Sequence, residues 1–164
     1  MQRLIEKSLD LLKDQHFDHL AVGVLDFSKG EFRSFEILEK NILSPKPLAY
    51  FDLASVTKPL TLACTKLYHP EFFDKDLNLL LNHRAGLPIG GRLSRKTWKE
   101  EILSYDIRES ETLYSDYSAL RLQLELEKRS GKGLRELCSS FWDKELCPWQ
   151  EIPEGAFTPS TGFR

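Results

Sequence analysis

The stretch Phe51-Asp52-Leu53-Ala54-Ser55-Val56-Thr57-Lys58-Pro59 decides how the rest of the chain is interpreted. Ser55 and Lys58 are three residues apart, so on a helix their hydroxyl and amine lie on one face as neighbours. A serine hydroxyl is a weak nucleophile until an adjacent base activates it. Lysine serves as that base only where burial or nearby positive charge lowers its pKa. The pattern therefore predicts an activated nucleophile at the start of a helix, where unpaired backbone N–H groups favour an oxyanion.

The same residues also fit an ordinary helix start. Ser55 is a suitable N-cap residue, and Lys58 would then be a solvated side chain of the first turn. A motif this short is a hypothesis until its surroundings agree with it. The rest of the chain therefore decides between the two interpretations.

Two further stretches follow in the chain, Leu79-Leu80-Leu81-Asn82-His83-Arg84-Ala85-Gly86-Leu87-Pro88 and Tyr114-Ser115-Asp116-Tyr117. Together with the Ser55 stretch they resemble the serine β-lactamase and penicillin-binding-protein superfamily, in its branch of class C β-lactamases, D-Ala-D-Ala carboxypeptidases and esterases. The resemblance extends roughly from Val22 to Arg164. It does not include the third motif of the family, a Lys/His-Thr/Ser-Gly triplet on a late strand. Ser160-Thr161-Gly162 follows Tyr114 too closely to be that triplet.

The resemblance implies a catalytic role for four residues. Ser55 would form an acyl-enzyme with the help of Lys58, and Tyr114 would carry the proton between nucleophile and leaving group. Asp116 would orient its neighbours; it stands where the family has asparagine, although aspartate occurs there in esterase-like members. The alternative for Tyr114 is a core aromatic residue at a turn. A carboxylate beside Lys58 would keep that lysine protonated and leave Tyr114 as the base. His83 is expected to support the structure and not to act as a base.

The resemblance also implies an oxyanion hole that uses the Ser55 N–H. Its second donor would lie on the late strand that this chain lacks, and losing one such donor costs roughly 10²–10³ in rate. The leading hypothesis is therefore a β-lactamase-related serine hydrolase, weak as this chain alone, that acts on an ester, amide, D-peptide or β-lactam. The alternative is a non-catalytic, incomplete relative that binds a partner chain or peptide. Whether coding sequence beyond Arg164 contains the third motif discriminates between them. An unrelated helical interaction protein remains as a third interpretation, with the motifs coincidental.

Composition argues against several other classes of protein. A net charge of −2 gives no reason to expect nucleic acid or an anionic membrane as partner. Cys64, Cys138 and Cys147 lack metal-ligand spacing, so no metal site, cofactor or disulfide framework is expected, and Cys64 is predicted to be a buried thiol. Charges within Met1–Asp10 and the lack of a transmembrane run predict a cytoplasmic protein, whereas family relatives often act outside the cytoplasm.

The periodicity predicts one helix-rich α+β domain of two parts. Residues 1–50 are expected to form a helix over 2–14, then a hairpin of a buried strand Leu20–Phe27 and a second strand Glu31–Leu38, with 39–50 as a loop. Residues 51–164 are expected to be helical over 55–68, 76–83, 97–105 and 134–146. The apolar residues of 120–127 alternate with period two, as in a strand, but Leu, Gln, Glu and Arg are strong helix formers and no β-branched residue occurs there. Together with the resemblance, this predicts a helix over 120–127. The predicted core faces are Val56, Leu60, Ala63, Cys64 and Leu67 on the helix over 55–68, Trp98, Ile102 and Leu103 on that over 97–105, and Leu137, Phe141 and Leu146 on that over 134–146. Gly86 is expected to adopt a conformation that only glycine tolerates well.

The resemblance predicts a β-lactamase/transpeptidase-like fold without its C-terminal sheet strands. In the family those strands complete the sheet that the N-terminal hairpin begins. Without them the hairpin exposes an edge and an apolar face. We therefore expect a fragment or frameshifted product, a chain whose sheet a second chain completes, or an unusual small sheet that rests on helices.

Overall fold

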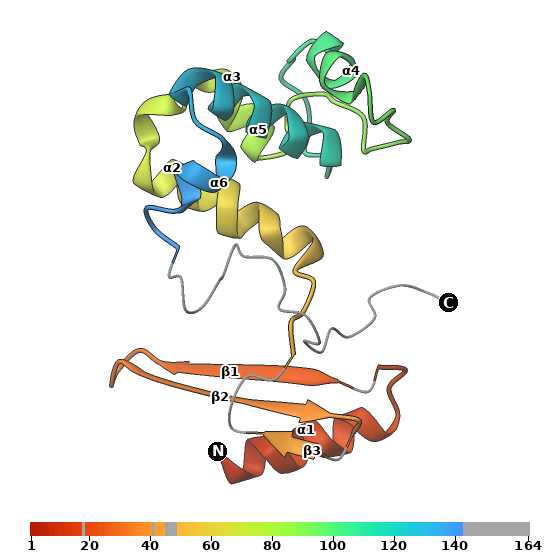
Figure 1. Cartoon of the computed structure of the whole chain (residues 1–164), viewed down its shortest axis with the longest axis vertical. Helices are drawn as coiled ribbons and strands as arrows, with labels where there is room; N and C mark the ends of the chain where they lie inside the picture. Colours follow the sequence, from red (N-terminus) through yellow and green to blue (C-terminus); the bar gives the residue numbers. More distant parts are fainter. Residues whose placement is uncertain (18, 41, 45–48, 143–164) are drawn as a thin grey trace. The chain divides into compact units, whose positions relative to one another are not determined.

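The computed structural model describes residues 1–17, 19–40, 42–44 and 49–142 of a helix-rich α+β protein. These residues fall into two compact units, 1–52 and 53–142 (Figure 1). The boundary lies next to the one predicted between residues 50 and 51. No helix within the described ranges is both long enough and apolar enough to cross a lipid bilayer.

The first unit consists of a helix and a three-stranded antiparallel sheet (Figure 1). Its elements are α1 (Gln2–Lys13), β1 (Leu20–Asp26), β2 (Glu31–Leu38) and β3 (Ile42–Ser44), and the strand order is β1-β2-β3. Leu12 of α1 forms a buried cluster with Phe35 and Ile37 of β2. The predicted N-terminal helix and hairpin are confirmed.

Two predictions for this unit are wrong. Strand β3 lies in the segment predicted to be a loop. The turn before it places Glu39 and Lys40 at φ of 50° and 62°, and the sequence shows none of the glycines that usually mark such a turn. Strand β1 is not buried but forms an edge of the sheet, with Val24 and Leu25 exposed. A valine-rich run indicates a strand, but the order of strands in a sheet depends on the rest of the chain.

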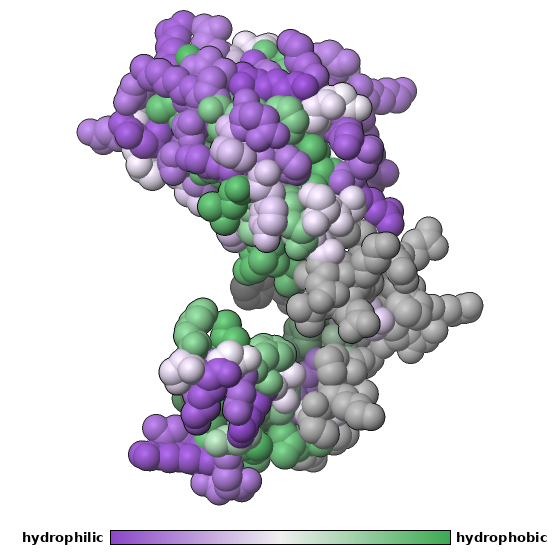
Figure 2. All heavy atoms as spheres, turned by 90° about the vertical axis from the view of Figure 1, so that its left-hand side faces the viewer, coloured by the Kyte–Doolittle hydropathy of each residue, from purple (hydrophilic) through white to green (hydrophobic). Residues whose placement is uncertain are grey.

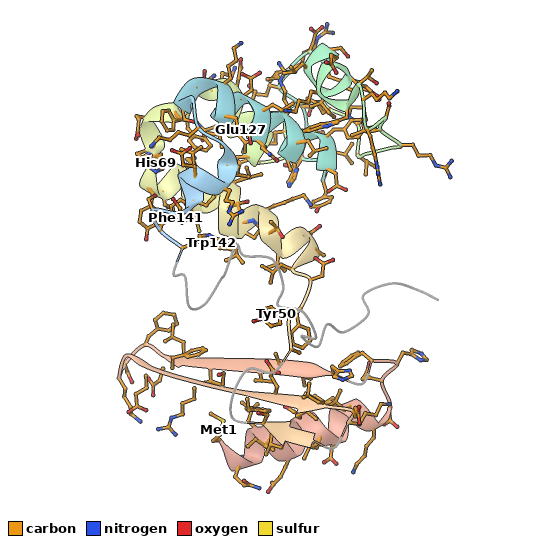
Figure 3. All side chains as sticks on the ribbon, in the orientation of Figure 1. Met1, Tyr50, His69, Glu127, Phe141 and Trp142 are labelled. Atoms are coloured by element: carbon orange, nitrogen blue, oxygen red, sulfur yellow. The ribbon has the colours of Figure 1, made fainter. Side chains whose placement is uncertain are left out.

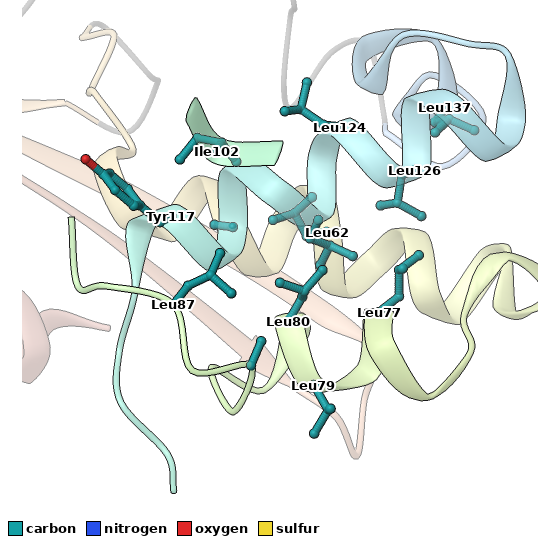
Figure 4. Close-up of a cluster of buried hydrophobic side chains, with 13 residues drawn as sticks. Leu62, Leu77, Leu79, Leu80, Leu87, Ile102, Tyr117, Leu124, Leu126 and Leu137 are labelled. Atoms are coloured by element: carbon teal, nitrogen blue, oxygen red, sulfur yellow. The ribbon is translucent and has the colours of Figure 1, made fainter. Parts of the chain in front are cut away.

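The second unit packs its helices around one apolar core. Its elements are η1 (Ala54–Val56), η2 (Pro59–Ala63), α2 (Cys64–Tyr68), η3 (Pro70–Phe72), α3 (Lys75–Leu81), α4 (Trp98–Ser104), α5 (Asp116–Ser130) and α6 (Leu134–Cys138). Leu80 of α3, Ile102 of α4 and Leu126 of α5 are fully buried there, and Leu62 brings η2 into the same core (Figure 4). This shared core is what fixes the first part of the unit against α5.

Residues 54–68, which we call the Ser55 segment, combine 3₁₀-, π- and α-helical turns. They begin as the 3₁₀ turn η1, continue as the π-helical turn η2 and end as the α-helix α2. Pro59 has no backbone N–H, so it cannot make the α-helical hydrogen bond to the Ser55 carbonyl. The π-helical turn begins at this proline, which accounts for the departure from α-helical pitch next to Ser55.

The buried face of the Ser55 segment differs from the predicted face. Thr61, Leu62 and Thr65 are buried, whereas Val56 and Leu67 are 54% and 77% exposed. The Oγ1 atoms of Thr61 and Thr65 donate to the backbone carbonyls four residues earlier, at 2.7 and 2.8 Å. Because both hydroxyls have acceptors, threonine is tolerated in the core at these positions. A pattern of hydropathy alone places such residues outside.

The predicted helix around Leu120–Glu127 is confirmed as α5. Gly131 ends it at a φ of 69°. In α4, however, Leu103 is 46% exposed, so only the neighbouring Ile102 faces the core fully. Successive residues of an α-helix are about 100° apart, so Leu103 is turned partly away from the core that Ile102 faces.

The predicted helix over 134–146 is shorter in the structure. Helix α6 ends at Cys138, and residues 139–142 are turns. Leu146, Cys147 and Ser160–Arg164 lie outside the described residues. Cys138 is the buried thiol, whereas Cys64, for which burial was expected, is only partly buried.

Residues after α6 contact the Ser55 segment (Figure 3). Trp142 Nε1 donates to the Leu60 carbonyl at 2.7 Å, and the Phe141 ring stacks on Tyr68 with 4.7 Å between centroids. Contacts with α6 and its following turn thus hold the segment in addition to the core.

Polar residues cover most of the face of this unit that Figure 2 shows, and apolar residues gather towards one end.

Asp74 joins the start of α3 to the end of α5. Its Oδ1 accepts the Leu77 N–H at 3.0 Å, and its Oδ2 pairs with Arg129 at 2.6 Å. We expect Asp74→Ala to lower the free energy of unfolding by about 1–2 kcal/mol in urea denaturation, because a capped N–H loses its acceptor. The exposed ion pair of Asp106 with Arg108 provides the control, and Asp106→Ala should cost less than about 0.5 kcal/mol. Equal losses in both variants would contradict the capping role.

The same contact predicts a dependence of stability on pH. The pKa of Asp74 is lowered, first by the Leu77 N–H and then by Arg129. The folded chain therefore favours the carboxylate, so this stabilisation is present above pH 3.8 and is lost as the pH falls below it. In Asp74→Ala this part of the acid dependence should be missing.

Candidate active site

The four residues predicted to form a site lie together in the second unit. Lys58 Nζ is 2.9 Å from Ser55 Oγ, 2.8 Å from the Tyr114 hydroxyl and 2.8 Å from Asp116 Oδ1. The Tyr114 hydroxyl is 2.8 Å from Ser55 Oγ. Ser55, Lys58 and Tyr114 therefore close a triangle of hydrogen bonds, although 59 residues separate Ser55 from Tyr114.

The Lys58 side chain uses its full capacity as a donor. An ammonium group has three N–H donors, and Lys58 has three acceptors, on Ser55, Tyr114 and Asp116. Burial by itself lowers the pKa of Lys58, but the hydrogen bonds to Asp116 and Tyr114 and the charge of Asp116 outweigh it and raise the pKa above 10.5. Lys58 is therefore a cation at neutral pH, as the aspartate at position 116 leads us to expect.

The backbone next to Ser55 is strained. Ala54 has a φ of 43°, in the left-handed region that residues with a side chain avoid. This conformation costs roughly 1–2 kcal/mol for an L-residue. Strain of this kind persists where the surrounding structure enforces it, and it is concentrated at functional sites.

The loop that carries Tyr114 is aligned by the segment after α3. These two segments run side by side, and backbone N–H groups of Arg108, Ser110, Leu113 and Asp116 donate to the carbonyls of Ala85, Arg84, His83 and Ile89, respectively. Gly86 belongs to the segment after α3 and has a φ of 71°, and a Cβ at this residue would be 3.1 Å from the Arg108 carbonyl of the other segment. The prediction of a glycine-specific conformation at Gly86 is confirmed.

Ser115 fixes the point at which α5 begins. Its hydroxyl accepts the Ser118 N–H at 2.9 Å as the N-cap of the helix and donates to the Pro88 carbonyl at 2.5 Å. Asp116 is therefore the first residue of α5, where the helix dipole favours a carboxylate. The N-cap thus places the Asp116 carboxylate within reach of Lys58.

A groove of about 540 Å³ opens at Ser55. It is lined by the Ser55 segment, α5 and the start of α6, namely by Ala54, Ser55, Thr57, Lys58, Thr61, Leu62, Asp116, Ala119, Leu120, Gln123 and Leu134. A second, mainly apolar pocket of about 290 Å³ shares Lys58, Leu62 and Ala119 with this groove. The groove has the size of a typical small-molecule site.

His83 is a site residue whose position the sequence does not reveal. Its ring packs against Tyr114 with 4.7 Å between centroids, and its Nδ1 accepts the Ser115 N–H at 3.2 Å. No spacing rule connects residues that lie about thirty positions apart in different segments, so the sequence indicates only a supporting role. His83 thus contacts Tyr114, one of the three residues of the hydrogen-bonded triangle.

Comparisons of the chain with models of protein families, with curated proteins and with solved structures find no match. Within residues 1–17, 19–40, 42–44 and 49–142, no group of three or more His, Cys, Asp or Glu side chains is arranged to hold a metal ion. The chemistry of the site is therefore argued from the groups that surround Ser55.

We expect Asp116→Asn to lower the pKa of Lys58. The substitution removes the negative charge 2.8 Å from Nζ, while the burial that favours the neutral amine remains. The measurement is a pH titration of the Lys58 ¹³Cε resonance by NMR, with Asp106→Asn as a control that should leave it unchanged. An unaltered Lys58 titration in Asp116→Asn would mean that the carboxylate does not set the charge of the lysine.

Proposed function

We propose that this chain is a β-lactamase-related serine hydrolase that forms an acyl-enzyme on Ser55. The observation that carries the proposal is the triangle of Ser55 Oγ, Lys58 Nζ and the Tyr114 hydroxyl, in which no separation exceeds 2.9 Å. A nucleophile, a cation and a proton carrier in mutual hydrogen-bond contact are the parts that acyl transfer requires. The proposal includes a relationship of this α+β chain to the β-lactamase/transpeptidase-like fold.

In the proposed reaction, Ser55 Oγ attacks the acyl carbon of an ester, amide, D-peptide or β-lactam. Tyr114 acts as the phenolate: it takes the Ser55 proton, becomes the neutral phenol, and gives that proton to the leaving group as the bond to the acyl carbon breaks. The Lys58 ammonium offsets negative charge on the Tyr114 oxygen, and Asp116 keeps that ammonium charged. Water then attacks the acyl carbon and the Tyr114 phenolate takes the water proton. Tyr114 returns this proton to Ser55 Oγ as the bond between Ser55 and the acyl group breaks, which restores both groups.

Intact-mass spectrometry after exposure to a fluorophosphonate and, separately, to a penicillin tests the proposal. We expect the wild-type chain to gain the mass of one fluorophosphonate adduct, because an activated serine reacts with this class of reagent. Ser55→Ala should gain none, and Ser94→Ala, a change of an exposed loop serine, should react as the wild type does. An adduct with penicillin would extend the substrates to β-lactams.

A folded wild-type chain without any adduct would overturn the proposal. The alternative, a non-catalytic relative that binds a partner chain or peptide, would then be favoured. Circular dichroism of each sample separates this outcome from simple unfolding. An adduct that persists in Ser55→Ala would assign the reactivity to another residue.

A further inference from the structure

His83 holds the Tyr114 loop by three contacts. Its carbonyl accepts the Leu113 N–H at 2.9 Å, and its Nδ1 accepts the Ser115 N–H at 3.2 Å. Its ring packs against the Tyr114 ring at 4.7 Å with an angle of 42° between the planes. One residue thus fixes the backbone on both sides of Tyr114 and the ring between them.

The backbone conformation of His83 is one that glycine adopts with less strain than histidine does. The His83 N–H donates to the Leu80 carbonyl and the Arg84 N–H donates to the Leu79 carbonyl, which is the Schellman pattern at the end of α3. The residue after the helix cap in this pattern usually is glycine, since it is left-handed, and His83 has a φ of 54°. A histidine here costs roughly 1 kcal/mol relative to glycine. A strained residue whose side chain reaches the proposed site points to a use for that side chain.

The contact with Ser115 requires neutral imidazole. Nδ1 can accept an N–H only when it carries no proton, so the ring proton is assigned to Nε2. Burial of the ring has the largest effect and lowers the pKa of His83. The Ser115 contact and the Asp116 carboxylate raise it and the Lys58 cation lowers it, so that on balance the pKa is lowered. At neutral pH the ring is therefore in the form that accepts the hydrogen bond.

We infer that neutral His83 is a positioning residue for the proposed acyl transfer, because it holds the Tyr114 hydroxyl within hydrogen-bond distance of Ser55 Oγ. The inference rests on the proposed function of Ser55. Protonation of Nδ1 would place an N–H donor against the Ser115 N–H and remove one of the three contacts. Loss of reactivity at acid pH is a consequence of this arrangement.

The rate of fluorophosphonate labelling in the full chain tests the inference, with His83→Gly and His83→Asn as the informative pair. Glycine relieves the left-handed strain but removes the ring and the acceptor. We expect His83→Gly to melt within a few degrees of the wild type and to label roughly 10- to 100-fold more slowly, as expected for a misplaced catalytic group. Asparagine tolerates a left-handed backbone, and its side-chain oxygen can accept the Ser115 N–H. His83→Asn should therefore recover most of the lost rate.

The pH profile provides a readout that a merely structural role would not change. The labelling rate of the wild type should decrease as the pH is lowered below 6.5, the usual pKa of histidine. This decrease should be absent in His83→Asn. Wild-type labelling rates in a folded His83→Gly chain would overturn the inference and leave the proposed function in place. No labelling of the wild type would overturn the proposed function, and the inference with it.

Discussion

Replacing Tyr114 with phenylalanine is expected to slow fluorophosphonate labelling of Ser55 by roughly 10²–10⁴-fold, the usual contribution of a positioned acid–base group. The substitution removes a single oxygen, which lies 2.8 Å from both Ser55 Oγ and Lys58 Nζ. The ring that packs against His83 remains, and the side chain is 48% exposed, so the fold should be unaffected. Labelling rates from time-resolved intact-mass spectra, with melting temperatures alongside, provide the measurement.

Tyr68→Phe is the matched control for this experiment. Tyr68 is 60% exposed and stacks on Phe141, and its hydroxyl is not part of the triangle at Ser55. Its labelling rate should equal that of the wild type. If Tyr114→Phe also labels at the wild-type rate, Tyr114 does not carry the Ser55 proton. Lys58 would then have to serve as the base, despite the pKa that its contacts raise.

The candidate site was predictable to different degrees from the sequence. The contact between Ser55 and Lys58 follows from a spacing of three residues, which needs only a helical turn. Tyr114 and Asp116 could be assigned only through a resemblance, because their approach to Lys58 depends on hydrogen bonds between two separate loops. For His83 a supporting role was expected, but its contact with the Ser115 N–H could not be predicted, since this contact depends on the left-handed end of a helix and on a backbone N–H of another segment.

The limits of the fold prediction have a similar cause. Amphipathic order located the helices, because their apolar faces must be buried somewhere. It failed on the Ser55 segment, where buried Thr61 and Thr65 satisfy their hydroxyls on the backbone and a π-helical turn alters the pitch. It also failed to predict β3. In the turn before this strand, Glu39 and Lys40 adopt left-handed conformations that their residue types do not predict.

Leu122→Ala is expected to have the largest effect on stability, a loss of about 2–5 kcal/mol in the free energy of unfolding. Leu122 of α5 is fully buried in the core that also contains Leu62 of the Ser55 segment and Leu80 of α3. Truncation removes apolar contacts and leaves a cavity where these elements meet. Leu103→Ala on α4 is the control, because a side chain that is 46% exposed should cost much less. Urea denaturation of both variants measures the difference, and equal losses would contradict this description of the core.

Leu122→Ala and Tyr114→Phe together distinguish an effect on stability from an effect on the reaction at Ser55. Leu122 and Lys58 both line the smaller pocket, so the core and the reactive groups are adjacent. Over most of the usual range of domain stability, about 5–15 kcal/mol, a loss of about 2–5 kcal/mol leaves the chain mostly folded. Leu122→Ala should therefore melt at a lower temperature yet keep most of its labelling rate well below that temperature. Tyr114→Phe should show the reverse, an unchanged melting temperature and a large loss of rate. If both variants lost reactivity only in proportion to their loss of stability, the triangle at Ser55 would be a structural contact and the proposed acyl transfer would be wrong.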